Sequence, residues 1–261
     1  MQTMATFTRN QVIAAAAGTL EVLEALGRGD APMTLAELVA ATGRPKGTVH
    51  RMASTLVNTG FATYTRETGR YALTLKAWRI GSVALRDFDL VELARPIMDK
   101  LRAETGETVH LSVLEPSGEI VYVAKVVSPK SIGVQTRLGQ LSPAWCTATG
   151  RSILAHRADM VEQVLRGPLE RRTPQTVVDP QAIRRLLEQV RRDGHAIARG
   201  ENHPDMGGVA APIFDHAGQV IASVGVAIPI YRMGADVVRG IVARVRQAAD
   251  AISHQLGHVP K

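Results

Sequence analysis

Cysteine, aromatic residues and long apolar runs are scarce in this sequence. Cys146 is the single cysteine of the chain, which excludes an internal disulfide framework and a cysteine-based zinc cluster. No apolar run approaches the roughly 20 residues of a membrane-spanning helix, and the N-terminus has no apolar signal-peptide core. These absences predict a cytoplasmic protein without membrane contact.

Acidic residues are also missing from one window, since no Asp or Glu lies between Glu37 and Glu67. Residues 1–80 hold nine Lys and Arg against five acids, a net charge of +4, whereas residues 81–261 have a net charge of +3. The chain has 261 residues and a net charge of +7, a length that suits one large domain or two ordinary ones. The charge distribution favours a polyanionic partner such as DNA at the N-terminal end.

The window without acids has the pattern of a helix-turn-helix. Apolar residues recur at i, i+3 and i+4 in two short segments on either side of Gly43, as they do in half-buried helices. Thr34 and Glu37 form a capping box at the start of the first segment, and Pro45 stands in the first turn of the second. We expect a further helix before them, over about Asn10–Leu26.

A hairpin pattern follows the helix-turn-helix. Gly60 closes the third predicted helix, and residues 61–64 and 71–74 alternate like two strands around a turn. Three helices and a hairpin make a winged helix, in which the second helix of the helix-turn-helix lies in the major groove of DNA. The predicted contacts with bases and phosphates are Arg44, Lys46, Thr48, His50, Arg51, Arg66 and Arg70.

The remaining two-thirds of the chain mixes strand and helix patterns, as in an α+β fold. A helical pattern over residues 75–102 is interrupted at Arg95-Pro96, and its apolar residues favour pairing with a second copy in a dimer. Strands are predicted over 108–114, 120–127, 132–136, 210–215 and 220–227, and helices over 152–166, 180–192 and 236–256.

Four motifs resemble the IclR family of bacterial transcription regulators. PKGTVHR, ETVHLSVL, LGQLSPAWCTATGRSILA and GVAAPIFDHAGQVIASVGVAIP occur in colinear order within residues 10–257. The resemblance implies an α+β protein with a winged helix-turn-helix domain at residues 1–74 and linker helices at 75–103. A GAF-like effector-binding and oligomerisation domain would follow at 104–257, with a tail at 258–261.

The same resemblance implies the partners of the protein. Family members are typically homodimers or dimers of dimers, and a dimer would read a pseudo-palindromic operator in double-stranded DNA. A small metabolite from a catabolic pathway would alter DNA binding or the recruitment of RNA polymerase.

The resemblance also places an effector pocket. Its residues would be Trp145, Thr147, Ala148, Thr149, Ala198, Gly208, Gly225 and Ala227. Thr147 can cap a helix whose first amides, at Ala148 and Thr149, would bind a carboxylate. Where members that bind small oxoacids have polar side chains, this chain has alanine and glycine. We therefore predict a larger, flatter ligand such as an aromatic acid, unless the polar side chains of residues 199–204 favour a small oxoacid.

Two other classes of function remain open at this stage. The protein could be an architectural DNA-binding dimer with a C-terminal domain that senses nothing, or an enzyme with a DNA-binding appendage. The sequence offers no catalytic constellation around Cys146, which we predict to be a buried structural residue. His110, His195, His203 and His216 match no compact metal-ligand spacing. We predict no catalytic residue, metal or cofactor.

Overall fold

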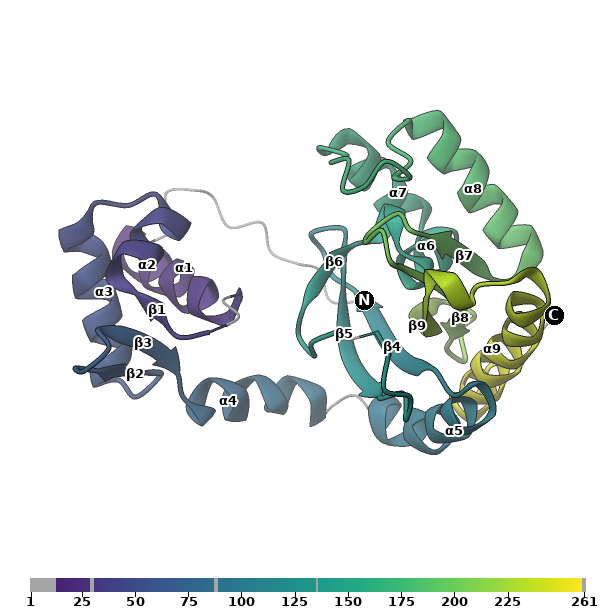
Figure 1. Ribbon diagram of the computed structural model, residues 1–261, viewed down its shortest axis with the longest axis horizontal. Coiled ribbons are helices and arrows are strands. Elements are labelled where there is room, and N and C mark those ends of the chain that lie inside the picture. The colour runs from purple at the N-terminus through teal and green to yellow at the C-terminus, as the bar shows by residue number, and fades with distance from the viewer. Residues whose placement is uncertain (1–12, 29–30, 87–88, 135, 260–261) are drawn as a thin grey trace. The chain divides into compact units, whose positions relative to one another are not determined.

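The chain divides into two compact units, one ending at residue 88 and the other beginning at residue 89. The computed structural model describes residues 13–28, 31–86, 89–134 and 136–259 (Figure 1). Among these residues, no helix is both long enough and apolar enough to cross a membrane.

The N-terminal unit is a winged helix with a small three-stranded sheet of order β1-β3-β2. Its core is formed by apolar side chains of α1, α2 and α3, closed by Tyr71 from β3. Its elements are α1 (Ala14–Arg28), β1 (Met33–Thr34), α2 (Leu35–Thr42), α3 (Lys46–Asn58), β2 (Ala62–Thr65), β3 (Arg70–Leu73) and α4 (Leu75–Arg86). The short strand β1 has no sequence signal of its own, because only its pairing with Tyr71 and Arg70 makes it a strand.

Local signals at the helix ends are mostly confirmed. The Thr34 amide donates to Glu37 Oε2 at 2.6 Å and the Glu37 amide donates to Thr34 Oγ1 at 3.3 Å, which completes the capping box. Gly43 ends α2 with φ of 64°, a conformation that favours glycine. Pro45 is the residue before α3 rather than part of its first turn.

Helix boundaries differ from the prediction by a few residues. α1 continues through Gly27 to Arg28, and α3 ends at Asn58, two residues before Gly60. The part of the first predicted helix before residue 13 lies outside the described residues.

The predicted helix break at Arg95-Pro96 is wrong. α4 ends at Arg86, and α5 (Asp89–Thr105) runs through Pro96 without interruption. Proline removes one hydrogen bond, to the carbonyl of Glu92. The buried stripe Leu90, Ala94, Met98 and Leu101 belongs to the core of the C-terminal unit, and its packing holds the helix together. α5 is therefore part of the C-terminal unit.

The C-terminal unit is a six-stranded antiparallel sheet of order β6-β5-β4-β9-β8-β7 with helices on both faces. Side chains alternate along each strand, so one face packs on α5 and α9 (Ala235–Gln255) and the other on α6 (Ala148–Leu154), α7 (Ala158–Arg166) and α8 (Pro180–Asp193). The strands are β4 (Thr108–Leu114), β5 (Glu119–Val126), β6 (Leu141–Pro143), β7 (Ala196–Arg199), β8 (Met206–Phe214) and β9 (Val220–Pro229).

Two predictions in this unit are wrong. The described part of residues 132–136 is a loop, in which Thr136 bonds to side chains rather than to a neighbouring strand. The single helix predicted over 152–166 is two helices, because the Thr147 cap starts α6 at Ala148 and α7 begins only at Ala158. The other predicted strands and helices are present within a few residues, and β6 and β7 are additional strands.

Candidate functional site

The C-terminal unit contains a cavity of about 120 Å³ between the sheet and the start of α6. Seven of the eight predicted effector residues line it, namely Thr147, Ala148, Thr149, Ala198, Gly208, Gly225 and Ala227. The eighth, Trp145, does not line the cavity and packs instead against the core formed by α6, α7 and α8. The predicted residues therefore come together from four separate elements.

Small residues form the floor of the cavity. Ala198, Gly208 and Ala227 are register partners in one row across β7, β8 and β9. A methyl group built on Gly208 would lie 3.2 Å from the Val226 carbonyl oxygen and 3.5 Å from Ala148 Cβ. This part of the floor is open only because position 208 has no side chain.

Gly225 has a different role, because it makes no additional space for a ligand. A Cβ atom there would lie 2.8 Å from Thr149 Cγ2 and 2.9 Å from Ala210 Cβ. The absent side chain therefore allows α6 to pack closely on β9, and the freed volume is filled by the protein itself.

The start of α6 forms one wall, as the sequence predicts. Thr147 Oγ1 accepts a hydrogen bond from the Gly150 amide at 3.2 Å and donates one to the Pro143 carbonyl at 2.9 Å. The amides of Ala148 and Thr149 stand in the first turn, where a helix offers no internal acceptor. Both residues line the cavity.

His110 is a polar wall residue that the sequence analysis considered only as a metal ligand. Its Nε2 lies 2.5 Å from Thr136 Oγ1, and its ring packs 4.8 Å from that of Tyr122. Burial, and then the charge of Lys125, lowers the pKa of His110 to about 4. The ring is therefore neutral at physiological pH and has one donor and one acceptor nitrogen. Strand alternation, which puts residues 108, 110 and 112 on one face, could have indicated this position.

Cys146 also lines the cavity. Its Sγ atom lies 3.9 Å from Asn202 Oδ1, and burial raises the pKa of the thiol to about 11. A thiol that stays protonated is a poor nucleophile, in agreement with a structural cysteine. Among the described residues, no group of three or more His, Cys, Asp or Glu side chains could hold a metal ion.

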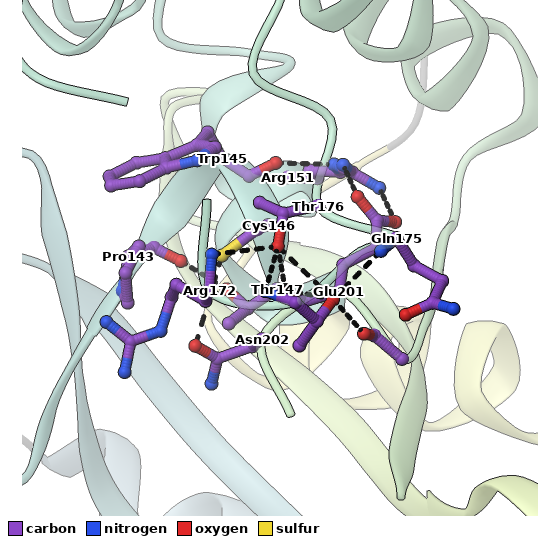
Figure 2. Close-up of polar contacts among 12 residues, drawn as sticks. Pro143, Trp145, Cys146, Thr147, Arg151, Arg172, Gln175, Thr176, Glu201 and Asn202 are labelled. Carbon is purple, nitrogen blue, oxygen red and sulfur yellow. Dashed lines mark hydrogen bonds and ion pairs between the residues drawn. The ribbon is translucent and has the colours of Figure 1, made fainter. Parts of the chain in front are cut away.

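The segment after β7 forms the remaining wall and is held by a buried ion pair (Figure 2). Glu201 lines the cavity, and its two carboxylate oxygens accept hydrogen bonds from Arg151 at 2.6 and 2.5 Å. Arg151 Nε donates to the Trp145 carbonyl at 2.7 Å. Arg199 is directed elsewhere, to the Met233 carbonyl at 2.8 Å. The pair has no local sequence signal, because its partners are 50 residues apart.

Four of the predicted DNA contacts on the N-terminal unit have side chains without a partner among the residues that the structure describes. Lys46, His50 and Arg51 are exposed on α3, and Arg66 is exposed in the turn between β2 and β3. Thr48 is half-buried on the same helix. This arrangement presents positive charge on the helix that the fold predicts as the reading helix.

The other two predicted contacts have partners within the protein. Arg44 donates to both carboxylate oxygens of Glu21, at 2.6 and 2.9 Å, and thereby ties the turn of the helix-turn-helix to α1. The hydrogen bond from Arg44 lowers the pKa of Glu21. Arg70 donates to the Pro32 carbonyl at 2.5 Å and to Glu37 at 3.4 Å. Both arginines thus support the local fold.

A groove of about 350 Å³ between α3 and the hairpin adds residues that the sequence analysis missed. Ser54 and Asn58 follow His50 along one side of α3, and Tyr64 faces them from β2 with its ring 4.7 Å from that of Tyr71. The spacing of 50, 54 and 58 is the i, i+4 signal that could have revealed this face.

Comparisons with known proteins agree with these observations. Residues 15–66 match the model of the IclR helix-turn-helix domain, and residues 82–254 match that of the bacterial transcriptional regulator IclR C-terminal domain. The chain is 33% identical over 239 residues to the HTH-type transcriptional regulator KdgR of Escherichia coli, covering 91% of this chain and 90% of that protein.

Solved structures show the same fold. The IclR transcriptional regulator from Alicyclobacillus acidocaldarius superposes with a TM-score of 0.81 at 26% identity, covering 94% of this chain and 100% of that one. An IclR homolog from Microbacterium hydrocarbonoxydans, complexed with 4-hydroxybenzoate, has a TM-score of 0.78 at 29% identity, covering 93% and 99%. The curated relative and both structures are named as regulators or IclR proteins, not as enzymes. The chain belongs to the IclR family of bacterial transcriptional regulators, with a DNA-binding helix-turn-helix and an effector-binding domain.

Proposed function

We propose that the cavity of the C-terminal unit binds a small aromatic carboxylate, and that this ligand controls the binding of the N-terminal unit to an operator. The observation that carries the proposal is the cavity itself, with a floor of small residues and walls of hydrogen-bonding groups, in which Arg151 pairs with Glu201, the one acidic side chain among the described lining residues. A purely architectural domain would have no need of a polar cavity in its interior.

The size of the cavity favours a ring. Its volume of about 120 Å³ is close to that of an engineered apolar cavity of ~150 Å³ that accepts benzene. An acid of two or three carbons would leave much of this space without contacts, and its affinity would fall accordingly. The open floor at Gly208 and Ala227 suits the flat face of an aromatic ring.

The donors favour a carboxylate. Ser142, Ala148 and Thr149 line the walls, and we assign their amide and hydroxyl groups as donors, because several hydrogen bonds together can hold an anion without a cationic side chain. The similar protein from Microbacterium hydrocarbonoxydans was crystallised with 4-hydroxybenzoate, which supports the same ligand class here.

We further propose that the DNA-bound form is a homodimer or a dimer of dimers, in which each protomer places α3 in one half-site of a pseudo-palindromic operator. Lys46, Thr48, His50, Arg51 and Arg66 would contact the DNA. The effector would change either the affinity for DNA or the recruitment of RNA polymerase.

A ligand panel tests the effector proposal. The melting temperature of the purified chain is measured with benzoate, 4-hydroxybenzoate, glyoxylate and pyruvate, and hits are carried into gel shifts on DNA selected from a random pool. We expect an aromatic acid to raise the melting temperature and to change DNA affinity. Preference for glyoxylate or pyruvate would contradict the proposal of an aromatic ligand. If none of the acids stabilises the protein, the architectural alternative is favoured.

One substitution links the ligand to the cavity. Ala148→Asp puts a negative charge beside the proposed carboxylate site and should abolish stabilisation by the acid, while DNA binding without ligand remains. Ala148→Asn has the same size without the charge and serves as the control, so equal losses in both variants would place the carboxylate elsewhere.

A further inference from the structure

We propose that Arg151, which does not line the cavity, makes the pocket accept an anion by neutralising Glu201 from behind the wall. The inference rests on the carboxylate effector proposed above. Glu201 is the one acidic side chain among the described residues that line the cavity, and none of those lining residues is Lys or Arg. Lys125 and Arg172 act on the lining residues His110 and Cys146 from outside the cavity, so the pairing of Glu201 decides whether a negative charge on the wall opposes them.

The pairing is complete and shielded from water. Arg151 is 1% exposed and Glu201 is 8% exposed, and the two side chains form two parallel hydrogen bonds of 2.6 and 2.5 Å. This bidentate geometry is the strongest common arrangement for a carboxylate and a guanidinium. Screening by solvent is weak at such a site, so removal of one charge would expose the ligand to the other.

The pair is also fixed in place on both sides. Arg151 belongs to α6 and donates through Nε to the Trp145 carbonyl at 2.7 Å. The main chain on the other side is held by Thr176 Oγ1, which donates to the Glu201 carbonyl at 2.6 Å (Figure 2). Thr173 Oγ1 likewise donates to the Gly200 carbonyl at 2.6 Å. Glu201 therefore has anchors besides Arg151, and its carboxylate would stay near the cavity if Arg151 lost its charge.

Two readings of this pair predict different results. If the ion pair only fixes the position of the wall segment, its loss should lower the affinity for all ligands to the same degree. If it sets the charge of the wall, its loss should weaken an anion far more than a neutral ligand of the same shape, because two like charges at short range repel. The matched probes are 4-hydroxybenzoate and its uncharged analogue 4-hydroxybenzamide.

The experiment is calorimetric titration of both probes into the full chain and four variants. Arg151→Met should lower affinity for the benzoate by about tenfold or more and affinity for the benzamide much less. Glu201→Gln leaves Arg151 unbalanced and should raise affinity for the benzoate above that of the wild type. The double variant Arg151→Met with Glu201→Gln removes both charges of the pair and should restore most of the affinity for the benzoate.

The control removes an equal charge from the same unit at an exposed pair. Arg184 Nη2 contacts both carboxylate oxygens of Glu162, at 2.9 and 3.0 Å, and the side chain of Glu162 is 51% exposed. Arg184→Met should leave both affinities unchanged, which excludes an effect of net charge alone.

Several outcomes overturn the inference. Equal losses of both probes in Arg151→Met, or no recovery in a folded double variant, would assign the pair to the fold alone. If Arg151→Met does not fold, the Glu201→Gln variant provides the test. The proposal is contradicted if this variant, compared with the wild type, loses more affinity for the benzoate than for the benzamide. A wild-type chain that binds neither probe nor any other aromatic acid overturns the proposed function itself.

Discussion

Single residues of the same type serve different purposes in the pocket of the C-terminal unit. Gly208 leaves part of the floor open, whereas Gly225 lets α6 approach β9. The sequence shows two glycines in equivalent strand patterns. Only the neighbouring atoms distinguish a position that makes room for a ligand from one that makes room for a helix.

This difference predicts that one added methyl group affects mainly stability at one position and mainly ligand binding at the other. Gly225→Ala should lower the free energy of unfolding by about 1–3 kcal/mol, because its Cβ would overlap Thr149 and Ala210. Gly208→Ala should cost less stability, since its Cβ would lie 3.2 Å from the Val226 carbonyl oxygen, and should weaken the binding of an aromatic acid. Chemical denaturation and calorimetry together measure both effects, and a stable Gly225→Ala variant would refute the packing argument.

The buried imidazole of His110 predicts a pH-dependent stability. Its pKa is about 4 in the folded chain and about 6.5 when the chain is unfolded. The unfolded chain therefore binds this proton first as the pH falls. Stability that is fully present above pH 6.5 is lost toward pH 4, by roughly 3 kcal/mol in all.

The measurement is the difference in unfolding free energy between wild type and His110→Gln at several pH values. The difference cancels the titration of carboxylates elsewhere in the chain. It should decline steadily between pH 6.5 and 4.5, and a constant difference would show that the imidazole is not held neutral.

At the scale of elements, an arginine on α3 is available to DNA, whereas an arginine in the turn before α3 supports the fold. Arg51 is exposed on the helix, while Arg44 in the preceding turn is engaged by Glu21 of α1. The same residue type in one basic stretch thus has two roles, set by whether another helix supplies a carboxylate.

Substitution of these two arginines should affect different properties, DNA binding for one and stability for the other. Arg51→Ala should weaken DNA binding about tenfold, and should reduce the salt slope by about 1 if it contacts a phosphate, without changing the melting temperature. Arg44→Ala should lower the melting temperature instead, because it releases the turn from α1. Gel shifts at matched salt and thermal unfolding test both, and unchanged DNA binding by Arg51→Ala would contradict α3 as the reading helix.

At the scale of the whole molecule, α4 has apolar side chains whose exposure to water would be unfavourable in a monomer. Leu75 is 81% exposed, Trp78 is 70% exposed and Ile80 is 51% exposed. Exposed apolar groups of this size on one helix are typical of surfaces that associate. A second copy of the chain suits them, since a two-fold operator needs two reading helices.

We expect Trp78→Ala to weaken the dimer by tenfold or more, because buried tryptophans commonly dominate interfaces at about 2 kcal/mol or above. Sedimentation over a concentration series measures the dissociation constant. Val237→Ala removes an apolar side chain that is 50% exposed on α9 and should leave the dimer unchanged. A wild-type chain that is monomeric at micromolar concentration would refute this role for α4.

Much of the fold follows from the sequence alone, because the signals are local. The capping box at Thr34, the cap at Thr147 and the alternation of β4, β5 and β9 each depend on residues a few positions apart. The IclR motifs then identified seven of the residues that line the cavity. These features are encoded within single helices, strands and turns, where periodicity and capping chemistry act directly.

Tertiary structure decided the rest, because the partners are distant in the chain. Residues from other elements set the roles of three side chains or positions. They determine whether Arg44 is available to DNA or paired with Glu21, and whether the space at Gly225 is open to a ligand or filled by α6. They also determine whether the charge of Glu201 in the pocket is neutralised. The continuity of α5 through Pro96 has the same origin, since burial of its stripe outweighs one lost hydrogen bond. A linear pattern records which residues can bury or pair, and only packing determines what they meet.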